Sequence, residues 1–129
     1  MKINIYTPYF SEIKKVVKKT AKYVIKKESM KKDINIIFVN KVELRKMKKE
    51  FLKQNLFTDV MSFELDEVNE VYLSPEVIHE NSIERSVNYV EELVRVVIHG
   101  ILHLKGLTDQ ELWEDQEKYV KEVLNLLKQ

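Results

Sequence analysis

Short segments rich in β-branched residues alternate along this chain with longer segments whose apolar residues recur at helical spacing. This alternation limits the chain to an architecture that mixes strands and helices. The strand pattern occurs at residues 2–6, 33–39, 58–65 and 70–73, and the helical pattern begins near residues 11, 41, 75, 82 and 109. We therefore predict one α+β domain over residues 1–129, in which a four-stranded mixed sheet packs against about five helices.

Capping residues predict where the helices begin and end. Asn40, Ser74 and Thr108 are each followed by an acidic residue within the first helical turn, which is typical of a helix start. The longest helical pattern runs from Ser82 to Leu104. We expect this helix to stop at Gly106, because glycine tolerates the left-handed conformation that often ends a helix.

The composition excludes several classes of protein. The 129 residues contain no cysteine, which rules out a disulfide framework, a thiol nucleophile and a Cys-ligated metal site. No apolar run approaches the roughly 18–20 residues that a membrane span needs, and residues 1–10 lack a signal-peptide pattern. We therefore expect a cytoplasmic protein without a membrane partner.

The net charge of +1 conceals a strong asymmetry along the chain. Residues 1–55 contain 16 Lys and Arg against 5 Asp and Glu, whereas residues 56–129 contain 6 against 16. A basic half can present a surface that attracts phosphates, although lysine-rich helix faces can also be simply solvated. The acidic half suits either a metal site or a basic partner.

Two of the three histidines, His99 and His103, are four residues apart in the longest helical pattern. This spacing places both imidazoles on one helix face, within reach of a single ion. A break at Gly106 lets the chain turn back, so that Asp109 can supply a third ligand. Two histidines and a carboxylate with an open position are typical of a catalytic zinc site, where bound water reaches a pKa of about 7.

Alternatives remain open for each of these residues. The two histidines could be satisfied core residues, and Asp109 could simply stabilise the start of the last helix. The spacing also resembles the zinc-protease motif HExxH, but Gly100 stands where that motif has its glutamate base, which argues against a peptidase. The third histidine, His79, is expected at the surface.

The segment from His99 to Asp109, HGILHLKGLTD, resembles the hallmark H-G-x-L-H-L-x-G-Y-D-H of the YbeY endoribonucleases, also called rRNA maturation factors. The segment FTDVMSF at residues 57–63 resembles a second segment of that family, P-T-D-V-L-S-F. Element order and length also agree, so the resemblance covers essentially the whole chain.

The resemblance implies an α+β fold with a four-stranded sheet and one metal ion, usually zinc, held by three histidines. His99 and His103 match the first two ligands, and Asp109 takes the place of the third. We expect one Zn²⁺ per chain, although this ligand set also accepts nickel, cobalt or manganese. The family's arginine aligns with Leu52, and the neighbouring Lys53 offers only a point charge.

Several further residues are candidates for the site. Arg95 lies one turn before His99 and could stabilise phosphate charge, or pair with Glu91 or Glu92. Asp59 and Ser62 could line the groove beside the metal, or serve turn chemistry and strand-edge hydrogen bonding. On the last helix, Trp113 and Tyr119 are expected in the core, with stacking on RNA as the alternative for Trp113.

The function implied by the resemblance is metal-dependent, single-strand-specific endoribonuclease activity in 3′-end maturation of 16S rRNA and in ribosome quality control. His99, His103 and Asp109 would act through metal-bound water with help from Arg95, and Lys53, Ser62 and Asp59 would contact RNA. Expected partners are single-stranded RNA, rRNA and the small ribosomal subunit with its proteins; we expect a monomer. Two alternatives are a ribosome-assembly RNA- or protein-binding factor with a structural metal, and a metallohydrolase acting on a substrate other than RNA.

Overall fold

The structure is a computed structural model that describes residues 1–8 and 11–129. Its strands are β1 (Ile3–Tyr6), β2 (Asp33–Phe38), β3 (Val60–Glu64) and β4 (Val68–Leu73). Its helices are α1 (Ser11–Lys27), α2 (Lys41–Leu52), α3 (Pro75–Arg85), α4 (Tyr89–His103) and α5 (Asp109–Leu127). The predicted α+β domain with a four-stranded sheet is confirmed, although β4 begins two residues earlier than expected.

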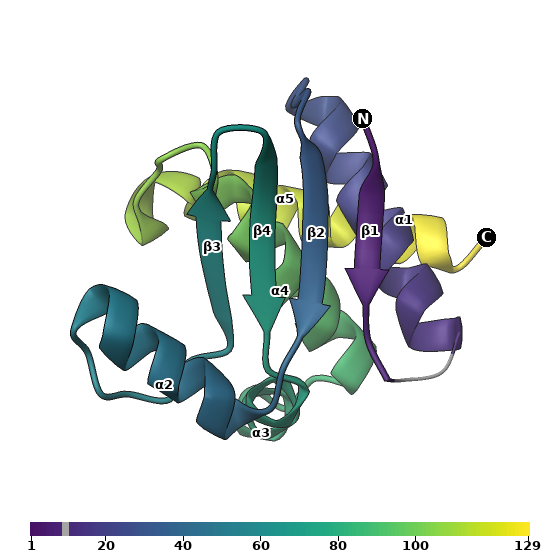
Figure 1. The fold of residues 1–129 in the computed structure, drawn as a ribbon. Helices are drawn as coiled ribbons and strands as arrows, with labels where there is room; N and C mark the ends of the chain where they lie inside the picture. The colour runs from purple at the N-terminus through teal and green to yellow at the C-terminus, as the bar shows by residue number, and fades with distance from the viewer. Residues whose placement is uncertain (9–10) are drawn as a thin grey trace.

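The sheet has the order β1-β2-β4-β3 and is mixed. β1 pairs parallel to β2 and β2 pairs parallel to β4, whereas β3 pairs antiparallel to β4 through a short hairpin. Helices α1 and α4 pack on one face of this sheet, and α5 packs on both of them (Figure 1). In that view none of the described helices lies on the face toward the reader.

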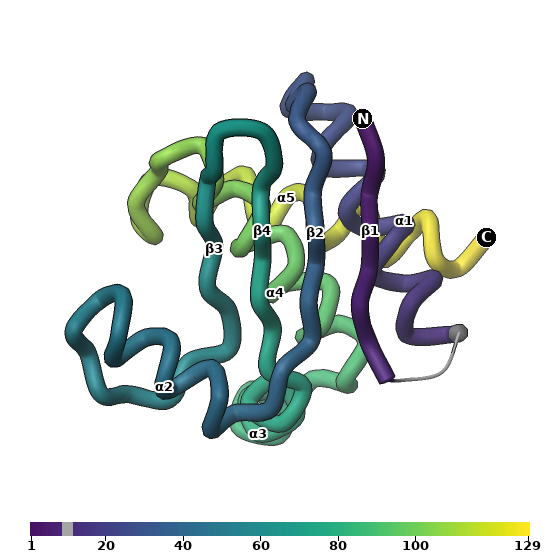
Figure 2. The backbone as a smooth tube through the Cα atoms, in the orientation of Figure 1, coloured from purple at the N-terminus to yellow at the C-terminus, as the bar shows by residue number. Residues whose placement is uncertain are grey.

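Helices α2 and α3 lie at the end of the sheet where its parallel strands finish; in Figure 2, α3 lies below β4 and α2 lies to its left, below β3. Each follows its strand directly, with the caps that the sequence predicts. The side chain of Asn40 accepts from the backbone N–H of Glu43, and that of Ser74 accepts from Val77. This arrangement brings the end of α3 beside the residues that enter β3, because Asn81 Nδ2 donates to Asp59 Oδ2 at 3.3 Å.

Helix α4 is the centre of the core. Ten of its residues are buried, and all but two of these, Glu92 and Arg95, carry no charge. Gly100 faces the sheet so closely that an added Cβ would lie 2.8 Å from Val60 Cγ2 and from Val71 Cγ1. The hydroxyl of Ser62 on β3 donates to the carbonyl of Gly100 at 2.6 Å. These contacts fix the position of α4 on the sheet.

The prediction of one helix from Ser82 to Leu104 is wrong. α3 continues to Arg85, and Ser86 then adopts a left-handed conformation with φ 58°. α4 begins anew after Asn88, whose side chain accepts from the N–H of Glu91 at 2.8 Å. The predicted helix counted Ile83 with the apolar residues of α4, because its spacing from them fits one helical face. Ile83 instead belongs to α3, where it is 66% exposed.

Helix α4 ends at His103, three residues before Gly106, whose φ of +79° is the left-handed turn that the sequence predicts near this point. Thr108 and Glu111 then form the reciprocal capping box that opens α5. Within the described ranges no helix combines the length and apolar character that crossing a membrane requires.

Candidate metal centre and adjoining pocket

Three side chains converge where α4 ends and α5 begins. His103 Nε2 lies 3.0 Å from His99 Nε2 and 2.6 Å from Asp109 Oδ1, and His99 Nε2 lies 3.3 Å from the same Asp109 oxygen. The two histidines come from successive turns of α4, and the turn at Gly106 returns the chain so that Asp109, the first residue of α5, faces them. The structure thus brings together the three residues that the sequence predicts as metal ligands.

A buried amide orients the first histidine. Gln116 on α5 is 2% exposed, and its Oε1 lies 2.6 Å from His99 Nδ1. Its Nε2 donates to Glu117 Oε2 at 3.0 Å, which fixes the amide because a carboxylate only accepts. His99 Nδ1 must therefore donate, and in the neutral imidazole its Nε2 then presents a lone pair toward His103 and Asp109.

The donor set fits a metal ion. Around a tetrahedral zinc with ligands at about 2.0–2.1 Å, neighbouring ligand atoms lie about 3.3 Å apart. His99 Nε2 and Asp109 Oδ1 have this spacing at 3.3 Å, whereas His103 Nε2 lies closer, at 3.0 Å from His99 Nε2 and 2.6 Å from Asp109 Oδ1, and would have to move away from them to share an ion. Acceptor atoms that face one another in this way repel unless a proton or a cation lies between them. Metal-binding histidines typically donate their other ring N–H to a neighbouring acceptor, as His99 does to Gln116. This group of residues can hold a divalent ion.

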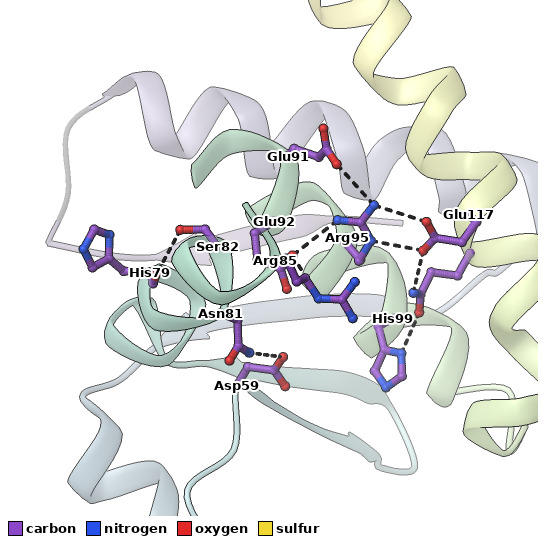
Figure 3. A network of polar contacts seen from close by, with 11 residues as sticks. Asp59, His79, Asn81, Ser82, Arg85, Glu91, Glu92, Arg95, His99 and Glu117 are labelled. Carbon is purple, nitrogen blue, oxygen red and sulfur yellow. Dashed lines mark hydrogen bonds and ion pairs between the residues drawn. The ribbon is translucent and has the colours of Figure 1, made fainter. Parts of the chain in front are cut away.

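Beyond Gln116 the hydrogen bonds continue into a cluster of charges on α4 and α5 (Figure 3). Glu117 accepts from Arg95 through Nε and Nη2, both at 3.1 Å. Burial alone would raise the pKa of Glu117, but hydrogen bonds from Arg95 and Gln116 outweigh it and lower that pKa. The carboxylate is therefore ionised and holds the amide of Gln116 in place.

Arg95 also contacts Glu92 Oε1 at 3.3 Å and Glu91 Oε2 at 3.4 Å. The sequence left two roles open for Arg95, and the structure shows the pairing with Glu91 and Glu92 that was one of them. With its side chain 11% exposed and three carboxylates around it, Arg95 acts as a link between α4 and α5. Burial raises the pKa of Glu92, against the opposing effect of its two arginines.

A pocket of about 230 Å³ adjoins the convergent donors. The residues that surround it come from α3, α4, α5 and the loop just before β3, and include Asp59, Arg85, His99, Asp109, Trp113 and Gln116. Burial raises the pKa of Asp59, which accepts from Asn81 as it lines this pocket. Asp59 therefore lines the same pocket as His99 and Asp109, and its predicted contact with RNA stays a prediction.

Other predicted site residues lie differently. The Ser62 hydroxyl donates to the Gly100 carbonyl on α4, a hydrogen bond between strand and helix that neither of its predicted roles named. Lys53 is exposed and lines a separate depression on α2 with Lys46, Lys49 and Glu50. Its predicted contact with RNA stays a prediction. His79 is exposed, as expected.

The expected burial of Trp113 is wrong, whereas Tyr119 is buried as expected. Trp113 is 51% exposed, because its position on α5 places it at the pocket and not in the core between α5 and its neighbouring helices. Sequence reasoning also missed Gln116 and Arg85. Gln116 is seven residues after Asp109, so helical spacing on α5 could have placed it on the ligand's face. No local signal places Arg85 in the pocket, because its position depends on the break at Ser86.

Comparisons with known proteins agree with this geometry. Residues 3–129 match the protein family described as endoribonuclease YbeY. The chain is 38% identical over 123 residues to the endoribonuclease YbeY of Thermotoga neapolitana, covering 88% of this chain and 83% of that one. The corresponding protein of Thermotoga maritima is 35% identical, with 88% and 82% covered.

A solved structure shares the fold. The solution structure of a Thermotoga maritima protein superimposes with a TM-score of 0.72 and 34% sequence identity, covering 98% of this chain and 91% of the other. The family match over nearly all residues and this structural similarity lead to one conclusion. The chain belongs to the endoribonuclease YbeY family.

Proposed function

We propose that the chain is a metal-dependent endoribonuclease that cleaves single-stranded RNA and acts in rRNA processing, including maturation of the 16S rRNA 3′ end. The observation that carries this proposal is the convergence of His99, His103 and Asp109 beside an open pocket, in a chain of the YbeY family. A divalent ion held by these three residues, zinc in our proposal, supplies Lewis-acid polarisation of a phosphoryl oxygen and lowers the pKa of water.

The residues of the chain position the substrate and the ligands. Gln116 fixes the tautomer of His99, and Asp109 contributes a negative charge that favours a cation at this point. The lysines of residues 1–55 attract the RNA backbone, so binding should weaken steeply with salt. Trp113, exposed at the pocket, offers a ring on which a base can stack. Electrostatic attraction of the backbone and stacking on a ring do not read base identity. We therefore expect the protein to bind single strands with little sequence preference.

A second function has specific support. Asp109 makes the site less electrophilic than a third histidine would, and Arg95 is held by three carboxylates. Both features suit a ribosome-assembly factor that binds RNA or ribosomal proteins and uses its metal to brace the α4–α5 corner. For either function we propose a cytoplasmic monomer that works on the small ribosomal subunit.

Cleavage of a labelled single-stranded RNA by the zinc-loaded protein tests the first proposal. We expect cleavage by the wild type, loss of at least 100-fold in His103→Ala, and no change in His79→Ala. His79 is the matched control because it is the third histidine and is exposed on α3.

Two results decide between the proposals. Cleavage that persists unchanged in His103→Ala would assign the activity to a contaminant and overturn the nuclease proposal. A wild type that binds RNA without cleaving it, and that retains binding in Asp109→Ala, would support the assembly factor instead.

A further inference from the structure

Arg85 brings a second guanidinium into the pocket beside the candidate metal centre. It is the last residue of α3, and the left-handed turn at Ser86 ends the helix there. Its side chain lines the same pocket as His99 and Asp109. Figure 3 shows the guanidinium of Arg85 extending from α3 toward His99.

The two arginines of this region differ in what they can still bind. Arg95 contacts Glu91, Glu92 and Glu117, and its side chain is 11% exposed. Arg85 makes one ion pair, from Nε to Glu92 Oε1 at 3.6 Å, and its side chain is 46% exposed. Among the described residues none makes a hydrogen bond with the Arg85 guanidinium. Its terminal Nη1 and Nη2 are therefore available to a ligand.

The charges around Arg85 indicate what that ligand must be. Asp59, Glu92 and Asp109 also face the pocket, so an anion can enter only where cations offset their charge. A guanidinium at the pocket wall and a divalent ion on the three convergent donors would provide that charge from two sides. A planar guanidinium with two free terminal nitrogens matches the oxygen spacing of a phosphate.

The size of the pocket limits the ligand further. At about 230 Å³ it is smaller than the roughly 300–1,000 Å³ of typical pockets that enclose a whole small molecule. It accommodates one phosphodiester linkage of a strand that passes over the surface, with the neighbouring bases outside. Trp113 at the pocket edge is placed to receive one of them.

We propose that Arg85 binds a phosphodiester of the RNA through Nη1 and Nη2 while its Nε remains on Glu92. This inference rests on the proposed RNA substrate and names the residue that holds the backbone next to the metal. The held phosphate then lies between Arg85 and the group His99, His103 and Asp109. Arg85 is thereby a substrate-binding residue, and Arg95 is a positioning residue behind it.

Fluorescence anisotropy tests the proposal. It measures, at several salt concentrations, how tightly a fluorescein-labelled single-stranded 2′-O-methyl RNA binds to the zinc-loaded protein. A gel run in parallel verifies that the oligonucleotide stays intact. We expect Arg85→Gln to weaken binding about 10-fold and to reduce the slope of log K against log salt by about 0.7, as loss of one phosphate contact from a single strand requires. Arg85→Lys should bind with an affinity between those of the wild type and Arg85→Gln, because lysine keeps the positive charge but cannot contact a phosphate through two nitrogens.

The control is Lys128→Gln, which removes one exposed charge at the end of α5, outside the lysine-rich residues 1–55, and should change binding by less than two-fold. Zinc content and the circular dichroism spectrum should match the wild type in all variants. Binding by Arg85→Gln within two-fold of the wild type, or a loss equal to that of Lys128→Gln, overturns the role of Arg85 alone. Failure of the wild type to bind the oligonucleotide overturns the proposed function as well, so the two failures are distinguishable.

Discussion

The amide oxygen of Gln116 lies 2.6 Å from Nδ1 of His99, and the amide nitrogen of the same residue donates to Glu117. The two contacts leave the imidazole one neutral tautomer, in which Nε2 is the acceptor. His103 has no comparable brace among the described residues. The two histidines of one helix are therefore not equivalent: His99 is preorganised for metal, and His103 is free to adjust.

Replacing Gln116 by leucine should weaken zinc binding about 10- to 100-fold, because metal-ligating histidines lose affinity by this factor when their second hydrogen bond is removed. Gln116→Glu should retain most of the affinity, since a carboxylate also accepts from Nδ1. Competition with a chromogenic chelator measures the affinity, and ¹⁵N NMR of the metal-free protein reports the His99 tautomer. Gln110→Leu, at an exposed position of α5, is the control. Equal affinities in Gln116→Leu and the wild type would contradict the prediction.

Removing the carboxylate of Asp109 should remove the metal. Elemental mass spectrometry of tag-free wild type should find about one zinc per chain, and Asp109→Ala should hold a small fraction of it because two ligands on one helix bind weakly alone. Asp109→His should keep the zinc. Asp115→Ala removes an exposed acid from the same helix and should leave the stoichiometry unchanged. A full zinc complement in Asp109→Ala would exclude Asp109 as the third ligand.

The sequence was sufficient for those parts of the structure that depend on neighbouring residues. The capping groups Asn40, Ser74 and Thr108 act within one turn, so the starts of α2, α3 and α5 could be predicted. The spacing of His99 and His103 fixes their shared helix face in the same way. The remaining parts required tertiary information.

The break at Ser86 is an instance, because apolar residues continue across it and only Asn88, three residues before Glu91, signals a new helix. Missing that break also concealed Arg85, which reaches the pocket only because α3 and α4 are separate. Trp113 was misplaced for a related reason. An aromatic residue at helical spacing is compatible with the core or with a pocket, and only the packing of α5 on α4 distinguishes them.

Adding one methyl group at Gly100 should destabilise the fold by about 1–3 kcal/mol, since the new Cβ would overlap Val60 and Val71 at 2.8 Å. Urea denaturation of Gly100→Ala measures the loss. Gly106→Ala has open space around its Cβ and should lose only about 1 kcal/mol for its left-handed backbone. The double variant Gly100→Ala with Val60→Ala should recover part of the loss, and its failure to do so would mean that the overlap is not the cause.

Glu28, just after α1, ties the α4–α5 turn to the core by accepting from Lys105 and from Tyr119. Burial raises its pKa, but these two hydrogen bonds prevail and hold the pKa below the usual 4.5. Because the pKa of Glu28 is lower in the folded state than in the unfolded state, the ionised carboxylate stabilises the fold at pH values above its unfolded-state pKa. This stabilisation is lost as the pH falls through the folded-state pKa. The wild type should therefore lose stability progressively below about pH 4.5.

At pH 7 the free energy of unfolding of Glu28→Gln should be about 1–3 kcal/mol lower than that of the wild type. Between pH 5 and 3 this free energy should fall less in Glu28→Gln than in the wild type. Urea denaturation at several pH values provides both quantities. Glu114→Gln, at an exposed position of α5, should follow the wild-type curve. Parallel curves for Glu28→Gln and wild type would show that Glu28 does not carry this pH dependence.

Trp113 is the only tryptophan of the chain, so its fluorescence reports directly on the pocket. Single-stranded RNA should quench this fluorescence, and Trp113→Ala should weaken binding about 5- to 100-fold through loss of stacking. Trp113→Phe should bind nearly as the wild type does, in an anisotropy titration. Leu126→Ala, at a residue 41% exposed on the same helix, is the control. Unchanged binding by Trp113→Ala would exclude a stacking role.

The absence of a side chain at Gly100 sets the distance between the ligand-bearing helix and the sheet, and this has an evolutionary consequence. The side chains at positions 60, 71 and 100 fill one volume between β3, β4 and α4. A larger side chain at one of these positions therefore requires a smaller one at another. Among related sequences, a larger residue at position 100 should therefore occur together with smaller ones at positions 60 and 71. Such covariation would tie the composition of two strands to a candidate metal centre to which neither strand contributes a residue.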